Sequence, residues 1–127
     1  MTPAFLIAAL IAMQAAPAAE RTDTLPPETT PVELSLESKA GLRCAAAFAL
    51  VSYGQSTGDP FTANWPNLGD RGREFFVREL ARIMDETGLD RAGIDRLASR
   101  EAQELIDKGE VDAVMPSCLV LLEQSVR

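Results

Sequence analysis

The sequence predicts an all-α fold, a small bundle of about four helices closed by one disulfide. Apolar residues recur at helical spacing in several segments, and no segment shows the sustained alternation of a half-buried strand. The two cysteines, Cys44 and Cys118, fall on the apolar faces of the first and last of these segments. We divide the chain into a signal peptide (1–19), a flexible linker (20–33) and a helical domain (34–127).

The first 19 residues are typical of a cleaved export signal. Their apolar run, residues 4–13, is shorter than the roughly 20 residues that span a bilayer. Ala16 and Ala18 supply the small-x-small pattern that signal peptidase cleaves. No Lys or Arg precedes the run, so the terminal amine is the only positive charge there. We predict a periplasmic or secreted protein that begins at Ala19 or Glu20, without stable membrane insertion.

The linker is polar and rich in threonine and proline over residues 20–31. Such a composition buries too little apolar surface to offset the entropy of ordering the chain. It predicts a flexible tether between the signal and the domain.

The first helix is predicted from about Ser35 to Tyr53, with its end at Gly54. Its buried face is formed by residues at i, i+4 and i+7, which are Cys44, Phe48 and Val51. Residues 54–69 are rich in glycine and proline and predict a loop.

The second helix is predicted from Asp70 or Arg71 to Thr87, with Gly88 after its end. Its expected buried face is Phe76, Leu80, Ile83 and Met84, with Phe75 beside them. The third helix has Asp90 as its N-cap and closes with Lys108 and Gly109. Its expected buried face is Ile94, Leu97, Ala98, Leu105 and Ile106.

The last helix is predicted to start near Asp112 or Met115. Pro116 is tolerated only in a first helical turn, so it either begins this helix or kinks it. The expected buried face is Val114, Cys118, Leu121 and Leu122.

The cysteine pattern favours a disulfide between Cys44 and Cys118. They lie 74 positions apart, which excludes a CxxC redox motif, and two ligands without histidine do not make a structural zinc site. In an oxidising compartment two lone cysteines in a small domain are typical of one bridge.

The formal net charge of −7 argues against nucleic acid or an anionic membrane as the partner. Three arginines, Arg71, Arg78 and Arg82, share one face of the second helix, but Glu74 and Glu86 stand four residues from two of them. Pairing at i,i+4 therefore accounts for this face. The third helix shows the same spacing in three pairs: Arg91–Asp95, Arg100–Glu104 and Glu104–Lys108.

The absence of histidine removes Ser-His-Asp and Cys-His nucleophile systems and HExxH zinc sites. No glycine-rich phosphate loop occurs, and we expect no cofactor or metal. A catalytic or calcium site would depend on Asp85, Glu86 and Asp90, whose spacing does not match an EF-hand loop. Helix capping and solvent exposure explain these residues more simply, so we predict that the protein is not an enzyme.

Aromatic residues gather around the predicted loop: Tyr53, Phe61 and Trp65. Phe61 and Trp65 are candidate contact residues for an unknown protein or small ligand. The alternative is that these aromatics fold back and close a core that contains few other large side chains. We expect the second arrangement for Trp65.

Three blocks resemble small exported two-cysteine helical proteins of bacteria that are themselves uncharacterised: LRCAAAFALVSYGQ, GREFFVRELARIMDETGL and DAVMPSCLVLLEQS. The resemblance covers residues 34–125 and implies a fold and a compartment, but no activity. The architecture is also similar to that of periplasmic acid-stress chaperones. The sequence thus predicts a non-catalytic exported interaction module, with an acid- or stress-responsive chaperone as the alternative and a carboxylate-based enzyme as a remote one.

Overall fold

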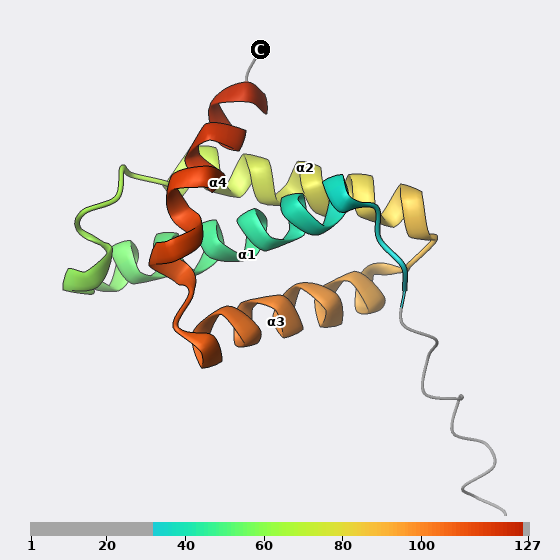
Figure 1. Ribbon diagram of the computed structural model, residues 1–127, viewed down its shortest axis with the longest axis horizontal. Coiled ribbons are helices and arrows are strands. Elements are labelled where there is room, and N and C mark those ends of the chain that lie inside the picture. The colour runs from blue at the N-terminus through green and yellow to red at the C-terminus, as the bar shows by residue number, and fades with distance from the viewer. Residues whose placement is uncertain (1–31, 126–127) are drawn as a thin grey trace, which may run out of the picture. The chain divides into compact units, whose positions relative to one another are not determined.

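The computed structural model describes residues 32–125, which form four α-helices (Figure 1). These are α1 (Leu36–Thr57), α2 (Gly69–Thr87), α3 (Arg91–Lys108) and α4 (Val111–Ser125), with a short 3-10 turn, η2 (Pro60–Thr62), between α1 and α2. No strand occurs in this part of the chain, so the all-α prediction is confirmed. The predicted cleavage residues Ala16 and Ala18, and residues 20–31 of the predicted linker, lie outside the described residues.

Helix α1 is the central element of the domain. It contacts α2, α3 and α4, and Figure 1 shows it between α2 and α3, with α4 crossing beside its C-terminal half. Three successive alanines, Ala45, Ala46 and Ala47, are all buried. Their small side chains let neighbouring helices approach from more than one direction, as expected for a helix that is apolar on most sides.

The predicted end of the first helix at Gly54 is wrong. Helix α1 continues to Thr57 and ends at Gly58, whose φ of 78° is the left-handed conformation that glycine adopts most easily. Gly54 is buried inside the helix because η2 packs over it, and a Cβ there would overlap the methyl group of Thr62. Glycine at this position therefore permits a close approach and does not end the helix.

The C-terminal ends of α2 and α3 agree with the prediction, and α2 starts one residue before the predicted Asp70. Their buried faces differ from the prediction, and the expected core residues Met84 and Leu97 are only half-buried. In α2 the side chain that fills the core is Phe75, which packs edge-to-face on Phe48 with ring centroids 5.1 Å apart, while Phe76 is only half-buried. In α3 the N-cap is confirmed, since the Asp90 carboxylate accepts the Gly93 N–H at 2.8 Å. Ile106, expected in the core, is exposed.

Helix α4 begins at Val111, earlier than predicted, so Pro116 lies in its second turn. The proline has no N–H, which leaves the carbonyl of Asp112 without its helical i+4 donor. Pro116 itself is exposed, and the face turned to the core is Met115, Cys118 and Leu122. The sequence missed Met115 on this face, and the expected Val114 and Leu121 are only half-buried.

The predicted disulfide is confirmed. Cys44 and Cys118 are bonded, their Cα atoms lie 5.2 Å apart, and both residues are buried. The bridge joins the middle of α1 to the middle of α4 across 74 positions of sequence.

The predicted i,i+4 pairs of α2 are wrong. Arg82 pairs with Glu79, three residues before it, and the other two arginines of that face bind α4. Arg71 pairs with Glu123 at 2.9 Å, and Arg78 donates to the carbonyl of Ser125 at 3.0 Å. Both contacts tie α2 to α4. Among the described residues, α3 forms only one of its three expected pairs, Glu104–Lys108 at 2.6 Å. None of the helices in this range combines the length and apolar character that crossing a membrane requires.

Candidate functional site

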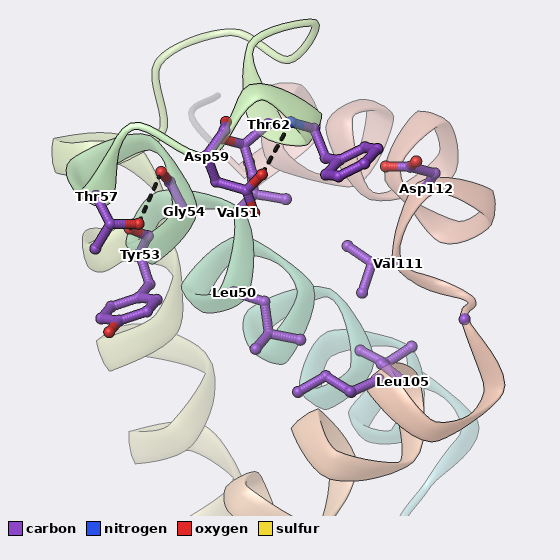
Figure 2. A pocket seen from close by; sticks show the side chains of 13 residues that line it. Leu50, Val51, Tyr53, Gly54, Thr57, Asp59, Thr62, Leu105, Val111 and Asp112 are labelled. Carbon is purple, nitrogen blue, oxygen red and sulfur yellow. Dashed lines mark hydrogen bonds between the residues drawn. The ribbon is translucent and has the colours of Figure 1, made fainter.

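A pocket of about 430 Å³ lies between the C-terminal end of α1, the η2 turn and the junction of α3 with α4. Its inner wall is aliphatic, with Leu50 and Val51 from α1, Leu105 from α3 and Val111 from α4. Figure 2 shows Leu50 and Val51 between Tyr53 on one side and Leu105 and Val111 on the other. The pocket thus brings together segments that are far apart in the sequence.

Three large apolar side chains of this pocket are exposed to solvent. Tyr53 is 71% exposed, Phe61 79% and Ile106 53%, and each comes from a different element. Single exposed apolar residues are common, but a group of them around a concave apolar wall is typical of an interaction site.

The loop that carries Phe61 is held in place by the side chain of Gln55. Its Nε2 donates to the carbonyls of Trp65 at 3.2 Å and Pro66 at 2.9 Å, and its Oε1 accepts the N–H of Leu68 at 3.1 Å. The start of η2 is capped by Asp59, whose carboxylate accepts the Phe61 N–H at 3.0 Å. Phe61 is therefore exposed on an anchored segment.

Trp65 is neither a fully exposed contact residue nor a fully buried part of the core, the two arrangements that the sequence suggested. It is half-buried against the core, and its indole N–H donates to the carboxylate of Asp112 at 3.0 Å. It does not line the pocket that Phe61 lines. The two predicted contact residues therefore separate: Phe61 is exposed at the pocket, and Trp65 fastens the loop to α4.

The only charged residues that line this pocket are two aspartates, Asp59 and Asp112. Both are exposed, and neither forms an ion pair within residues 32–125. The two threonine hydroxyls of the pocket are engaged by backbone carbonyls: Thr57 donates to Tyr53 and Gly54, and Thr62 donates to Asp59. The lining therefore has negative charge and no hydroxyl paired with a base.

The sequence did not identify Ile106, Val111 and Asp112 as pocket residues. Ile106 was assigned to the core together with its neighbour Leu105, although adjacent residues point about 100° apart around a helix. That angle is the signal that could have placed Ile106 outside the core. Val111 and Asp112 were missed because Pro116 suggested a later start for the last helix.

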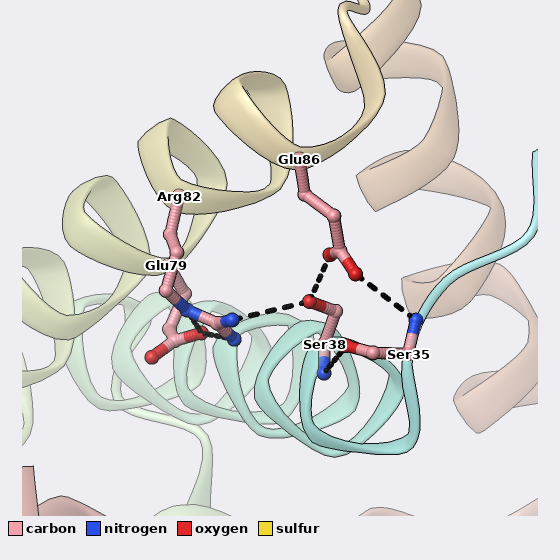
Figure 3. A network of polar contacts seen from close by, with 5 residues as sticks. All are labelled: Ser35, Ser38, Glu79, Arg82 and Glu86. Carbon is pink, nitrogen blue, oxygen red and sulfur yellow. Dashed lines mark hydrogen bonds and ion pairs between the residues drawn. The ribbon is translucent and has the colours of Figure 1, made fainter.

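The three acidic residues considered for catalysis have structural roles or are exposed. Asp90 caps α3, and Asp85 is exposed on α2. Glu86 accepts hydrogen bonds from the hydroxyl of Ser38 and, at 3.2 Å, from the N–H of Ser35, at the start of α1 (Figure 3). In the described part of the chain, no three His, Cys, Asp or Glu residues are placed to hold a metal ion.

Ser38 is the fully buried polar residue at the centre of this contact. Besides donating to Glu86, it accepts from Nη1 of Arg82 at 3.2 Å, and Arg82 is held by Glu79 at 2.7 Å (Figure 3). Hydrogen bonds from Ser38, and next from Ser35, lower the pKa of Glu86 below its ordinary value. Glu101 on α3 shows the opposite effect, because burial raises its pKa.

Comparison of the chain with models of protein families, with curated proteins and with solved structures found no match in any of the three. The resemblance to small exported two-cysteine proteins therefore stays a prediction. Function has to be argued from the pocket itself.

The contact at Glu86 predicts how stability depends on pH. A lowered pKa in the folded state stabilises the fold above the unfolded value of 4.5, and this contribution is lost as the pH falls through the folded pKa. We expect Glu86→Gln to lower the free energy of unfolding at neutral pH, and its difference from wild type to close in acid. Denaturant unfolding at a series of pH values measures this difference.

Glu101→Gln is the control for that experiment. Because the pKa of Glu101 is raised, wild type should gain stability relative to this variant as the pH falls, the opposite slope. If the two variants show the same slope, the contact at Glu86 does not determine the acid response.

Proposed function

We propose that the chain is a non-catalytic interaction module, periplasmic or secreted, that binds an apolar segment of a partner protein. One observation carries this proposal: Tyr53, Phe61 and Ile106, from three different elements, are exposed around an aliphatic pocket. A volume of about 430 Å³ suits a few apolar side chains of a partner.

The chemistry of the lining supports binding rather than catalysis. Its two threonine hydroxyls donate to backbone carbonyls, and its two carboxylates are exposed and in contact with neutral donors. Among the described residues, no hydroxyl of the lining is hydrogen-bonded to a carboxylate, the arrangement that an activated nucleophile would need.

Export is supported by the disulfide. Bridges form and persist in oxidising compartments and are rare in the cytosol. The bond between Cys44 and Cys118 is compatible with a location outside the cytoplasm. The choice between periplasm and secretion belongs to the proposal.

Titration with a blocked synthetic peptide of alternating leucine and serine tests the proposed function. The change in Trp65 emission serves as the readout, because its indole is bonded to the pocket residue Asp112. We expect Phe61→Ser and Ile106→Ser each to weaken binding about tenfold, as truncation of a contact residue does.

The matched control is Val120→Ser. Val120 is also exposed and apolar, at 58%, but it does not line the pocket. This variant should bind as wild type does. Equal weakening by Val120→Ser and Ile106→Ser would contradict the assignment of the pocket.

An acid-responsive chaperone is the second candidate, favoured by the contact of Glu86 with Ser38. Protonation of Glu86 would weaken the connection between the start of α1 and the end of α2. A chaperone of this kind should expose apolar surface and bind a reporter dye at about pH 2–3 while its helices persist. Loss of helix without dye binding would exclude this candidate.

A further inference from the structure

The pocket has an acidic side made by two elements. Figure 2 shows Asp59, from the segment between α1 and η2, and Asp112, from the first turn of α4, with Leu50 and Leu105 further down in the same view. Each carboxylate accepts one hydrogen bond through its Oδ1, from Phe61 N–H and from the Trp65 indole respectively. The other oxygen of each has no donor among the described residues.

Two basic side chains at the junction of α3 with α4 are already engaged. Lys108 pairs with Glu104 at 2.6 Å, and Arg43 pairs with Glu110. Lys108 and Arg43 line a different groove, between α1 and α3. No Lys or Arg of residues 32–125 lines the pocket, so its two negative charges are not neutralised from within.

The exposed aromatic residues of the pocket also favour a cation. The faces of Tyr53 and Phe61 carry partial negative charge and attract a Lys or Arg side chain that lies over them. A carboxylate and an aromatic face in one pocket therefore both favour a cation, whereas an acidic partner would meet repulsion.

We propose that the partner segment carries Lys or Arg beside its apolar residues, so that the pocket takes a cationic amphipathic segment of a protein. This inference rests on the proposed function. The apolar side chains of the segment occupy the wall formed by Leu50, Leu105 and Val111, and its cations lie beside Asp59 and Asp112.

A small free cation does not fit the same observations. Exposed carboxylates in water attract a single cation weakly, and such pairs alone contribute little. The aliphatic wall adds affinity only for a partner that also buries apolar surface there. The two features together select a chain that presents both kinds of group.

Four blocked synthetic peptides titrated into the oxidised protein test the inference: alternating leucine–lysine, leucine–serine, leucine–glutamate and serine–lysine. Trp65 emission is the readout. We expect the leucine–lysine peptide to bind about tenfold more tightly than leucine–serine, and leucine–glutamate more weakly than either. The advantage of lysine should shrink as salt is added, because the carboxylates are exposed.

Substitution of the two aspartates locates the effect. Asn at positions 59 and 112 keeps an oxygen that accepts from Phe61 N–H and from the Trp65 indole, and removes only the charge. We expect Asp59→Asn with Asp112→Asn to abolish most of the tenfold preference for lysine. The control is Asp85→Asn with Asp95→Asn, which changes the net charge equally and should keep the preference. These residues lie near the end of α2 and the start of α3, and Figure 1 shows the α2–α3 connection at the opposite end of the bundle from the α3–α4 junction.

The outcomes separate the inference from the proposed function. If leucine–serine binds as tightly as leucine–lysine, the inference is overturned and the proposed function stands. If serine–lysine binds as tightly as leucine–lysine, the inference is overturned, because charge attraction alone explains the binding. The same holds if both double variants lose the preference for lysine equally. If no leucine peptide changes Trp65 emission at about 1 mM, where even weak sites fill, both fail.

Discussion

Replacing both Cys44 and Cys118 with alanine is expected to lower the free energy of unfolding by about 4 kcal/mol. The bridge closes a loop of 74 positions, and a crosslink over so long a loop removes much of the conformational freedom of the unfolded chain. A domain of this size is typically stable by about 5–15 kcal/mol, so the loss is a large share of the total. Urea unfolding of the oxidised wild type and of the double variant measures it.

Reduction provides the control for this prediction. Dithiothreitol should destabilise the wild type by a similar amount and leave the double alanine variant unchanged, because only the wild type has a bond to break. If the double variant unfolds within about 1 kcal/mol of the oxidised wild type, the bridge adds little to what helix packing already provides.

Phe48→Ala is expected to cost about 3–5 kcal/mol of unfolding free energy, the range for a large side chain deleted from a core. Phe48 is fully buried in the middle of α1, and its ring meets Phe75 of α2 edge to face. Deletion leaves a cavity where the central helix contacts its largest neighbour, and Phe48→Leu, which fills most of that space, should cost roughly half as much or less.

Phe61→Ala is the matched control, since it removes the same side chain from an exposed position. Phe61 is 79% exposed, so its truncation should change stability by about 0.5 kcal/mol or less. Similar losses for Phe48→Ala and Phe61→Ala would contradict the burial described here. The pair also separates stability from binding, because only Phe61 is proposed to contact the partner.

The sequence was sufficient for the elements whose signals are local or strongly periodic. Asp90 and Gly109 mark the ends of α3 by their capping chemistry, and the cysteines fall on the buried faces of two helices that pack together. A capping residue acts within one turn, and two cysteines in one small domain allow only one intramolecular bridge. These features do not depend on how the helices are arranged.

Features set by tertiary contact were the ones that the sequence misplaced. Gly54 looks like a helix end, but it is the site where η2 packs on α1. The choice of Phe75 over Phe76 for the core depends on the direction from which α1 approaches α2. For the same reason the pocket was only half predicted: Phe61 was recognised from its loop, whereas Ile106 joins it only after α3 and α4 are in place.

The hydrogen bond from Trp65 to Asp112 limits how far the pocket can open. It joins the loop that carries Phe61 to the first turn of α4, through a tryptophan that does not line the cavity and an aspartate that does. An occupant that fits between the walls leaves this bond intact, whereas a bulkier one must break it to widen the opening. If the pocket binds the proposed segment, it would therefore select ligands by width as well as by charge. In an NMR titration, the indole proton of Trp65 would report whether a ligand leaves this bond intact or breaks it.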